Sequence, residues 1–273
     1  MPPEYADKSF WDARFTKERH FEWLGGGEPL LEHVRKHLES CRRAGDILPI
    51  TLHIGAGTSS LCESIMDVYG QLGYKGGVAV VNTDFAAEAI AIQLASERAQ
   101  PPDLRSEWTQ ADALSWEDIT RLAIQYGGED DRMQVFDIVV DKSTSDAISC
   151  GQDVAFHLEA DRSKRDHPAL LSAVRAKGEV VLEPLQLLAL HLAAVVRPGG
   201  LWITLSYSSN RFPFLKTELS KENEQDLMLD ATQWWVVEAV EEVEAPSGQE
   251  RQGVHSPRVT HNLYVLRRTG VVA

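Results

Sequence analysis

Short apolar runs alternate with longer segments of helical period through most of the chain. Two of the helical segments lie at 60–73 and 86–99. The apolar runs are too short for helices, and we expect strands at 50–54, 77–83, 105–111, 136–140 and 201–207. Strands and helices that alternate in this way form a parallel sheet with right-handed crossover connections.

The pattern changes in the last third of the sequence. Residues 181–200 are apolar around most of a helical circumference, which predicts a buried crossover helix with Arg197 in its last turn and Pro198 as its stop. Residues 234–245 and 258–268 alternate apolar and polar positions, which is typical of an antiparallel hairpin at a sheet edge. The prediction is an α/β fold with a doubly wound, seven-stranded, mostly parallel sheet and a C-terminal antiparallel hairpin.

Length and composition favour a single domain over residues 1–273. The chain is 43% hydrophobic and 25% charged, which suits one sizeable core. Two polar stretches rich in turn formers, 151–167 and 244–257, interrupt the pattern, and we expect them to be mobile.

The charge balance restricts the partners. With 41 acidic and 27 basic residues the formal net charge is -14, which disfavours a nucleic-acid partner because phosphate backbones require clustered lysine and arginine. No apolar run approaches the roughly 20 residues needed to cross a bilayer, and residues 1–15 lack a secretory signal pattern. We therefore expect a soluble, cytoplasmic protein without membrane association.

Cysteines and histidines give no metal or disulfide pattern. Cys41, Cys62 and Cys150 are odd in number and widely spaced, which indicates neither a disulfide framework nor a thiolate zinc site. His33 and His37 could share one helix face, but the sequence offers no evident third ligand. We predict no metal site.

The end of the first predicted strand carries the first candidate site. Ligands of an open α/β sheet bind beyond the carboxyl ends of its strands, and here the sequence reads Gly55-Ala56-Gly57. Such glycines allow a tight turn and close approach of a ligand to the backbone, although a plain strand-to-helix turn is an equal alternative. Ser60 stands in place of the third glycine of the dinucleotide fingerprint, which counts against NAD.

The next three strands each end near a carboxylate. Asp84, followed by Phe85, ends the second strand and is the best candidate for the ribose hydroxyls. Asp112 with Ala113 suits an adenine amino group, and Asp141 ends the fourth strand. Helix N-caps are the alternative for Asp84 and Asp112, but one shared nucleoside ligand explains the three acids better than independent capping.

These residues resemble class I S-adenosylmethionine-dependent methyltransferases. The glycine turn and the strand-end acids match the motifs of that family in order, from about residue 46 to the terminal hairpin. Residues 10–15 (FWDARF) with 21–23 (FEW), and residues 136–148 (FDIVVDKSTSDAI), are similar to motifs of a methyltransferase-like group that includes lysine methyltransferases of translation elongation factor 1-alpha.

The resemblance implies S-adenosyl-L-methionine as the cofactor. The glycines would contact its methionine and ribose moieties, Asp84 its ribose hydroxyls, and Asp112 with Ala113 its adenine. Residues 1–27 would form a lid whose Arg14 faces the methionine carboxylate. The expected cofactor-binding set is Trp11, Arg14, Gly55, Ala56, Gly57, Asp84, Phe85, Asp112 and Ala113.

The methyl acceptor is less defined. The resemblance places Asp141 beside the transferable methyl as the catalytic residue that orients an acceptor amine, and it favours a lysine of a basic protein, which the net charge would attract. Ser143 and Ser145 replace residues common in the family, and residues 206–212 match a "QPHFR" motif only loosely. A small metabolite enclosed by an insertion at 151–180 is therefore an alternative, and a non-catalytic binding module is the third.

Overall fold

A seven-stranded sheet forms the centre of the computed structural model, which describes residues 4–44, 48–96, 103–127, 133–157, 166–216, 229–245 and 259–271. The strand order within these residues is β3-β2-β1-β4-β7-β9-β8. The first five strands in that order are parallel, and β9 and β8 are antiparallel. The strands span β1 Thr51–Ile54, β2 Gly77–Asp84, β3 Leu104–Gln110, β4 Phe136–Lys142, β7 Val196–Ser206, β8 Trp235–Glu244 and β9 Thr260–Arg268.

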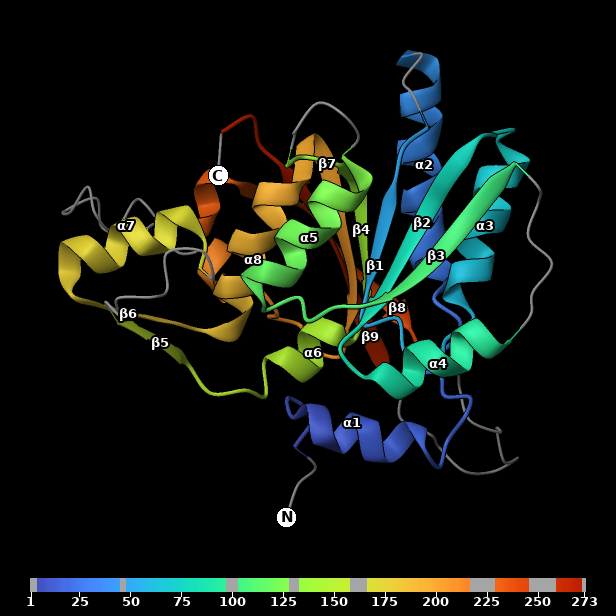
Figure 1. The fold of residues 1–273 in the computed structure, drawn as a ribbon. Helices are drawn as coiled ribbons and strands as arrows, with labels where there is room; N and C mark the ends of the chain where they lie inside the picture. Colours follow the sequence, from blue (N-terminus) through green and yellow to red (C-terminus); the bar gives the residue numbers. More distant parts are fainter. Residues whose placement is uncertain are drawn as a thin grey trace.

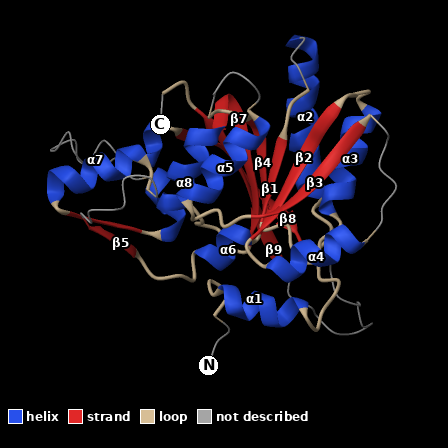
Figure 2. Cartoon of the chain, viewed as in Figure 1, coloured by secondary structure: helices blue, strands red, loops and turns tan. Residues whose placement is uncertain are grey.

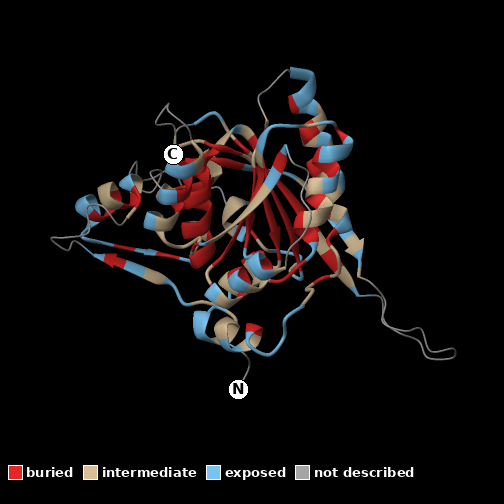
Figure 3. Ribbon diagram, turned by 45° about the vertical axis from the view of Figure 1, so that its right-hand side comes forward, coloured by how far each residue is buried: buried red, intermediate tan, exposed pale blue. Residues whose placement is uncertain are grey.

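Helices cover both faces of the sheet, as Figures 1 and 2 show. Helices α2 (Glu28–Ala44) and α3 (Leu61–Gln71) pack on one face, and α5 (Trp116–Tyr126) and α8 (Pro184–Val195) pack on the other. Adjacent residues of a strand point to opposite faces of the sheet and so join different hydrophobic cores. Ile138 packs with α2 and α3, whereas Val139 packs with α5 and α8. Burial on both faces explains why these strands are continuous apolar runs (Figure 3).

The predicted fold class and all seven predicted strands are confirmed. The predicted end of the crossover helix is wrong, because α8 ends at Val195 and Arg197 lies in β7. Val196 already has an extended backbone, and the Arg197 guanidinium binds both carboxylate oxygens of Asp137 on β4 at 3.0 Å. Trp235, in the terminal hairpin, is a core residue.

Part of the stretch expected to be mobile is ordered. Residues of β5 (Val154–His157) pair antiparallel with β6 (Glu179–Leu182), and α7 (Pro168–Lys177) precedes β6. This two-stranded sheet is separate from the central one. Residues 158–165 of that stretch, and residues 246–257 of the second one, lie outside the described residues.

Short elements gather where the parallel strands end. Helix α1 (Lys8–Phe15) lies across this end of the sheet, close to α4 (Ala87–Ala95) and α6 (Thr144–Ile148) (Figure 1). Phe15 of α1 packs on Ala86 and Ala89 beside β2. Two 3-10 turns, η2 (Pro213–Leu215) and η3 (Ala231–Gln233), follow β7. In the described part of the chain, no helix combines the length and the apolar character needed to cross a membrane.

Candidate functional site

A cavity of about 1210 Å³ opens at the carboxyl ends of the parallel strands. The glycine turn, the ends of β2 and β4, α6 and the segment after β7 contribute to its wall, and amino-terminal aromatic residues complete it: Tyr5, Trp11, Phe15, Phe21 and Trp23. Eight of the ten predicted site residues line it: Trp11, Gly55, Ala56, Gly57, Asp84, Phe85, Asp112 and Ala113. Arg14 and Asp141 do not.

The glycine turn needs its glycines. Gly55 and Gly57 have φ angles of 55° and 53°, in the left-handed region that residues with a Cβ rarely adopt. A Cβ on Gly55 would also collide with the side chain of Thr144. A Cβ on Gly57 would approach the ring of Phe15 to 3.4 Å. The turn therefore exposes bare backbone between α1 and α6, where a ligand can approach closely.

Asp84 links the end of β2 to this turn. One carboxylate oxygen accepts a hydrogen bond from the Gly57 amide at 2.9 Å, and the other accepts from the Ala86 amide at 2.8 Å. Asp84 is not the N-cap of α4, because Ala86 holds that position. The side chain is 5% exposed, and burial raises its pKa to about 6. Each oxygen keeps a further lone pair that a hydroxyl can use.

Asp112 lies at the exit of β3. Its carboxylate accepts from the Leu114 amide at 2.9 Å, and Ser115, not Asp112, is the N-cap of α5. Burial raises the pKa of Asp112. The next residue, Ala113, is held from behind, because its carbonyl accepts a hydrogen bond of 3.1 Å from the imidazole Nδ1 of the buried His191. This loop is thus fixed where it lines the cavity.

Asp141 points into the protein interior. Its side chain is 0% exposed, and it accepts hydrogen bonds from the Thr144 amide at 2.8 Å, from the amide and hydroxyl of Ser145, and from the Thr204 hydroxyl at 3.3 Å. Burial raises its pKa to about 6. The structure therefore differs from the expectation that Asp141 touches an acceptor. Its carboxylate instead fixes the start of α6.

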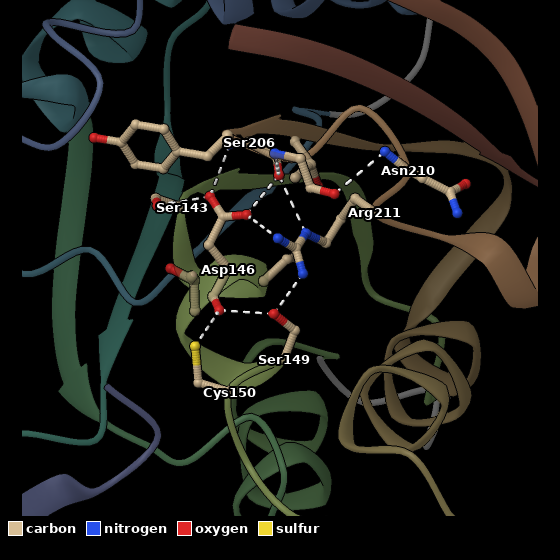
Figure 4. Close-up of polar contacts among 12 residues, drawn as sticks. Ser143, Asp146, Ser149, Cys150, Ser206, Asn210 and Arg211 are labelled. Atoms are coloured by element: carbon tan, nitrogen blue, oxygen red, sulfur yellow. Dashed lines mark hydrogen bonds and ion pairs between the residues drawn. The ribbon is translucent and has the colours of Figure 1, made fainter. Parts of the chain in front are cut away.

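Asp146, five positions after Asp141, lines the cavity. It forms an ion pair of 2.5 Å with Arg211 and also accepts from the hydroxyls of Ser143 and Ser206 at 2.8 and 2.5 Å (Figure 4). The amide of Tyr207 donates to the same carboxylate at 3.1 Å. We did not predict this pair, although Asp146 lies within the 136–148 match and Arg211 lies within the loose "QPHFR" match at 206–212.

Arg14 is engaged within the amino-terminal segment. Its guanidinium donates to Glu18 at 3.1 and 3.2 Å and lies 3.9 Å from the ring centroid of Phe21. Trp11, by contrast, lines the cavity and stacks on Phe15 with ring centroids 5.8 Å apart.

Glu22 occupies the amino end of α3, directly after the glycine turn. Its carboxylate accepts from the Ser60 amide at 2.7 Å and hydroxyl at 3.0 Å, and it forms an ion pair with Lys142 of β4. A helix amino end in this position binds pyrophosphate in dinucleotide-binding proteins. A carboxylate already bound there opposes a second anion, so the site is unsuited to NAD or FAD.

Two other features lie outside this cavity. A depression of about 1660 Å³ lies at the opposite end of the sheet, where Arg197 pairs with Asp137 and Arg267 with Glu238. His33 of α2 contacts Glu241 at 3.3 Å. Among the residues that the structure describes, no three histidine, cysteine, aspartate or glutamate side chains lie close enough to hold a metal ion.

Comparisons with known proteins give one curated relative. The chain is 28% identical over 213 residues to methyltransferase srdJ of Neurospora crassa, covering 77% of this chain and 70% of that protein. No family model matches.

Two similar solved structures cover nearly the whole chain. A SAM-dependent methyltransferase of Anabaena variabilis covers 98% of this chain and 96% of its own, with 11% identity and a TM-score of 0.49. The N-methyltransferase NodS of Bradyrhizobium japonicum, in complex with S-adenosyl-L-homocysteine, covers 97% and 98%, with 12% identity and a TM-score of 0.40. The doubly wound sheet, the cavity at its carboxyl end and the methyltransferase relative together support an S-adenosylmethionine-dependent methyltransferase with a Rossmann-like fold.

Proposed function

We propose that the cavity binds S-adenosyl-L-methionine through the glycine turn and the ends of β2 and β3, and that the rest of it receives a small-molecule methyl acceptor. The observation that carries the cofactor assignment is the Asp84 carboxylate, which borders the cavity while bound to the Gly57 amide at 2.9 Å. It can accept from ribose hydroxyls, and Asp112 and Ala113 stand one strand further along for the adenine. Gly57 has no side chain, which leaves room for the remainder of the cofactor.

The strand order then locates the acceptor. A nucleoside over β1, β2 and β3 leaves the space over β4 and β7, where Asp146, Tyr207 and Arg211 line the cavity. The volume of about 1210 Å³ exceeds the roughly 300–1,000 Å³ of a typical small-ligand site. Tyr5, Trp23 and Tyr207 form an aromatic wall there, with ring centroids 5.7 and 6.0 Å apart. Such a wall suits a compact acceptor with an apolar body.

A lysine of a basic protein, as in the elongation-factor methyltransferases that the sequence resembles, is the second candidate. Five acidic and two basic side chains line the cavity, and the chain has a net charge of -14, so a cationic segment would be attracted. The acidic residues of the cavity are Glu4, Asp7, Asp84, Asp112 and Asp146. Against this candidate, the Asp141 carboxylate that the resemblance assigns to the amine is buried and does not line the cavity.

The protein's part in the reaction is positional. The cofactor supplies a methyl group on a sulfonium, and its transfer needs an in-line lone pair and exclusion of water. Asp146 and Arg211 offset each other's charge in an ion pair, and together they give the acceptor side of the cavity polar groups in fixed positions. The amino-terminal segment with Phe21 and Trp23, and strand β5 with Val154, would enclose the acceptor, because these three residues line the cavity.

The test is incubation with methyl-tritiated S-adenosylmethionine and a cell extract separated into protein and small-molecule fractions. We expect label in the small-molecule fraction, and less of it with an Asp84→Asn variant. Label confined to a protein band would favour the lysine candidate. Absence of transfer to either fraction, with S-adenosylhomocysteine bound, would favour a non-catalytic module.

A further inference from the structure

Glu22 joins three separate parts of the site. Its carboxylate accepts from the Ser59 hydroxyl at 2.9 Å and from the Ser60 amide at 2.7 Å, both at the amino end of α3. It also accepts from the ammonium of Lys142, the last residue of β4. Glu22 lies 38 positions before Ser60 and 120 before Lys142, so these contacts attach the amino-terminal segment to the sheet.

The amino end of α3 depends on this contact. Its N-cap, Ser60, makes no capping bond with its own side chain, so the carboxylate of Glu22 satisfies a backbone N–H that the helix leaves free. Burial opposes ionisation of Glu22, but the hydrogen bonds from Lys142 and Ser60 prevail and lower its pKa. An ionised carboxylate is the form that interacts favourably with a helix amino end.

Lys142 depends on the same contact. Its side chain is 3% exposed, and its ammonium donates to Glu22 and, at 2.8 Å, to the carbonyl of Gly25. A buried ammonium is costly unless it is paired. Both of these acceptors come from the amino-terminal segment, so the strand end and the segment stabilise each other.

The attached segment covers the cavity. Phe21 and Trp23, on either side of Glu22, line it, and the Phe21 amide donates to the Thr58 hydroxyl at 3.0 Å. The ring of Trp23 contacts Tyr207 edge to face at 6.0 Å, across the acceptor half.

We propose that Glu22 and Lys142 are positioning residues that hold residues 10–23 over the bound cofactor, so that cofactor release requires this attachment to open. The inference rests on the proposed function for the identity of the cofactor. Neither residue is assigned a contact with the reacting atoms.

The experiment compares Glu22→Gln with Glu32→Gln, which removes the same charge from an exposed pair with Lys36 on α2. Amide hydrogen exchange of the ligand-free protein reports on the segment, and stopped-flow displacement of S-adenosylhomocysteine reports on release. For Glu22→Gln we expect faster exchange in residues 10–23 and at the Ser60 amide that donates to Glu22, and about tenfold faster dissociation, the equivalent of one lost charge-assisted hydrogen bond. Glu32→Gln should change neither.

Unchanged dissociation from Glu22→Gln, or faster exchange spread evenly over β1, β4 and α3, would overturn the inference, since the pair would then serve only global stability. If the wild-type chain binds no S-adenosylhomocysteine, the proposed function fails. The inference is then decided by the exchange pattern alone. Glu22→Asp, which keeps the charge on a shorter side chain, should restore slow exchange in part.

Discussion

Asp146 and Arg211 lie 65 positions apart in the sequence and form an ion pair of 2.5 Å on the wall of the cavity (Figure 4). The pair joins α6 to the segment after β7. Asp146 belongs to the segment 141–146, which joins the end of β4 to the start of α6. In this segment the Asp141 side chain points inward to the start of α6, and the Lys142 side chain reaches Glu22 of the amino-terminal segment. Residues 141–146 therefore hold both sides of the acceptor region in place.

Breaking the Asp146–Arg211 ion pair should lower the free energy of unfolding and the rate of methyl transfer, and should leave the affinity for the cofactor unchanged. Both side chains are 13% exposed, so Arg211→Met leaves a largely buried carboxylate without its cation, at a cost of about 3 kcal/mol. The comparison is Arg197→Met, which breaks a pair whose arginine is 44% exposed and should cost about 1 kcal/mol or less. Urea unfolding measures both. Equal costs for the two variants, or lost S-adenosylhomocysteine affinity in folded Arg211→Met, would contradict the assignment.

Gly55→Ala should destabilise the protein and weaken cofactor binding. The positive φ of 55° and the collision with Thr144 both oppose a Cβ. The matched change is Gly70→Ala in α3, where a Cβ meets no atom within 4 Å and helix propensity should add about 0.5–1 kcal/mol of stability. Thermal melting and calorimetric titration check both. Tolerance of alanine at Gly55 would show that the turn is not needed in this conformation.

Cofactor affinity should fall as the pH decreases below about 6. Burial raises the pKa of Asp84 to about 6 in the free protein, and ribose hydroxyls favour its ionised form, so protonation opposes binding by up to about tenfold per pH unit. Lys8 and Asp12 of α1 also act on Asp84, but they pair with each other at 2.6 Å. S-adenosylhomocysteine titrations from pH 5 to pH 8 should show this dependence, and Asp84→Asn should abolish it. A flat wild-type profile would remove Asp84 from the site.

The same carboxylate should not stabilise the ligand-free fold at neutral pH. Its pKa in the folded chain is above the model-compound value of 3.8, so its contribution to stability is present below that value and is lost as the pH rises through about 6. In Asp84→Asn at pH 7.5, removal of the buried charge should offset the loss of one of the two backbone hydrogen bonds, so we expect a melting temperature close to that of the wild type. A fall of several degrees would indicate a structural role.

The spacing of apolar residues along the chain, together with the residue types, was sufficient to predict the central sheet. Runs such as 136–140 are apolar because both faces are buried, and the hairpin alternates because β8 exposes one face. Strand β6 (Glu179–Leu182) was missed because its last two residues were assigned to the crossover helix predicted from residue 181, although Glu183 and Pro184 mark the actual start of α8. Its partner β5 is equally short, and pairing across more than 20 residues has no local signal.

The site was predictable as a set of strand ends but not in its side-chain directions. Topology brings Gly55, Asp84 and Asp112 to one cavity whatever their rotamers. The direction of Asp141 depends on the Thr204 hydroxyl of a strand 63 positions later, and Arg14 is taken up by Glu18 and Phe21. The contact with Thr204 is tertiary, so spacing along the sequence does not reveal it, whereas Arg14–Glu18 and the bonds of Asp141 to Thr144 and Ser145 are local contacts that spacing could have indicated.

Calorimetric titration of the wild-type chain with S-adenosylhomocysteine and with NAD, repeated on Asp84→Asn and on Glu88→Gln, tests the central claim most directly. Glu88 lies on α4 near Asp84 but does not line the cavity, so its substitution controls for lost charge. The account predicts S-adenosylhomocysteine binding without NAD binding, weakened by about 1–3 kcal/mol in Asp84→Asn and unchanged in Glu88→Gln. Binding of NAD in preference to S-adenosylhomocysteine, or equal S-adenosylhomocysteine affinity in all three proteins, would contradict it.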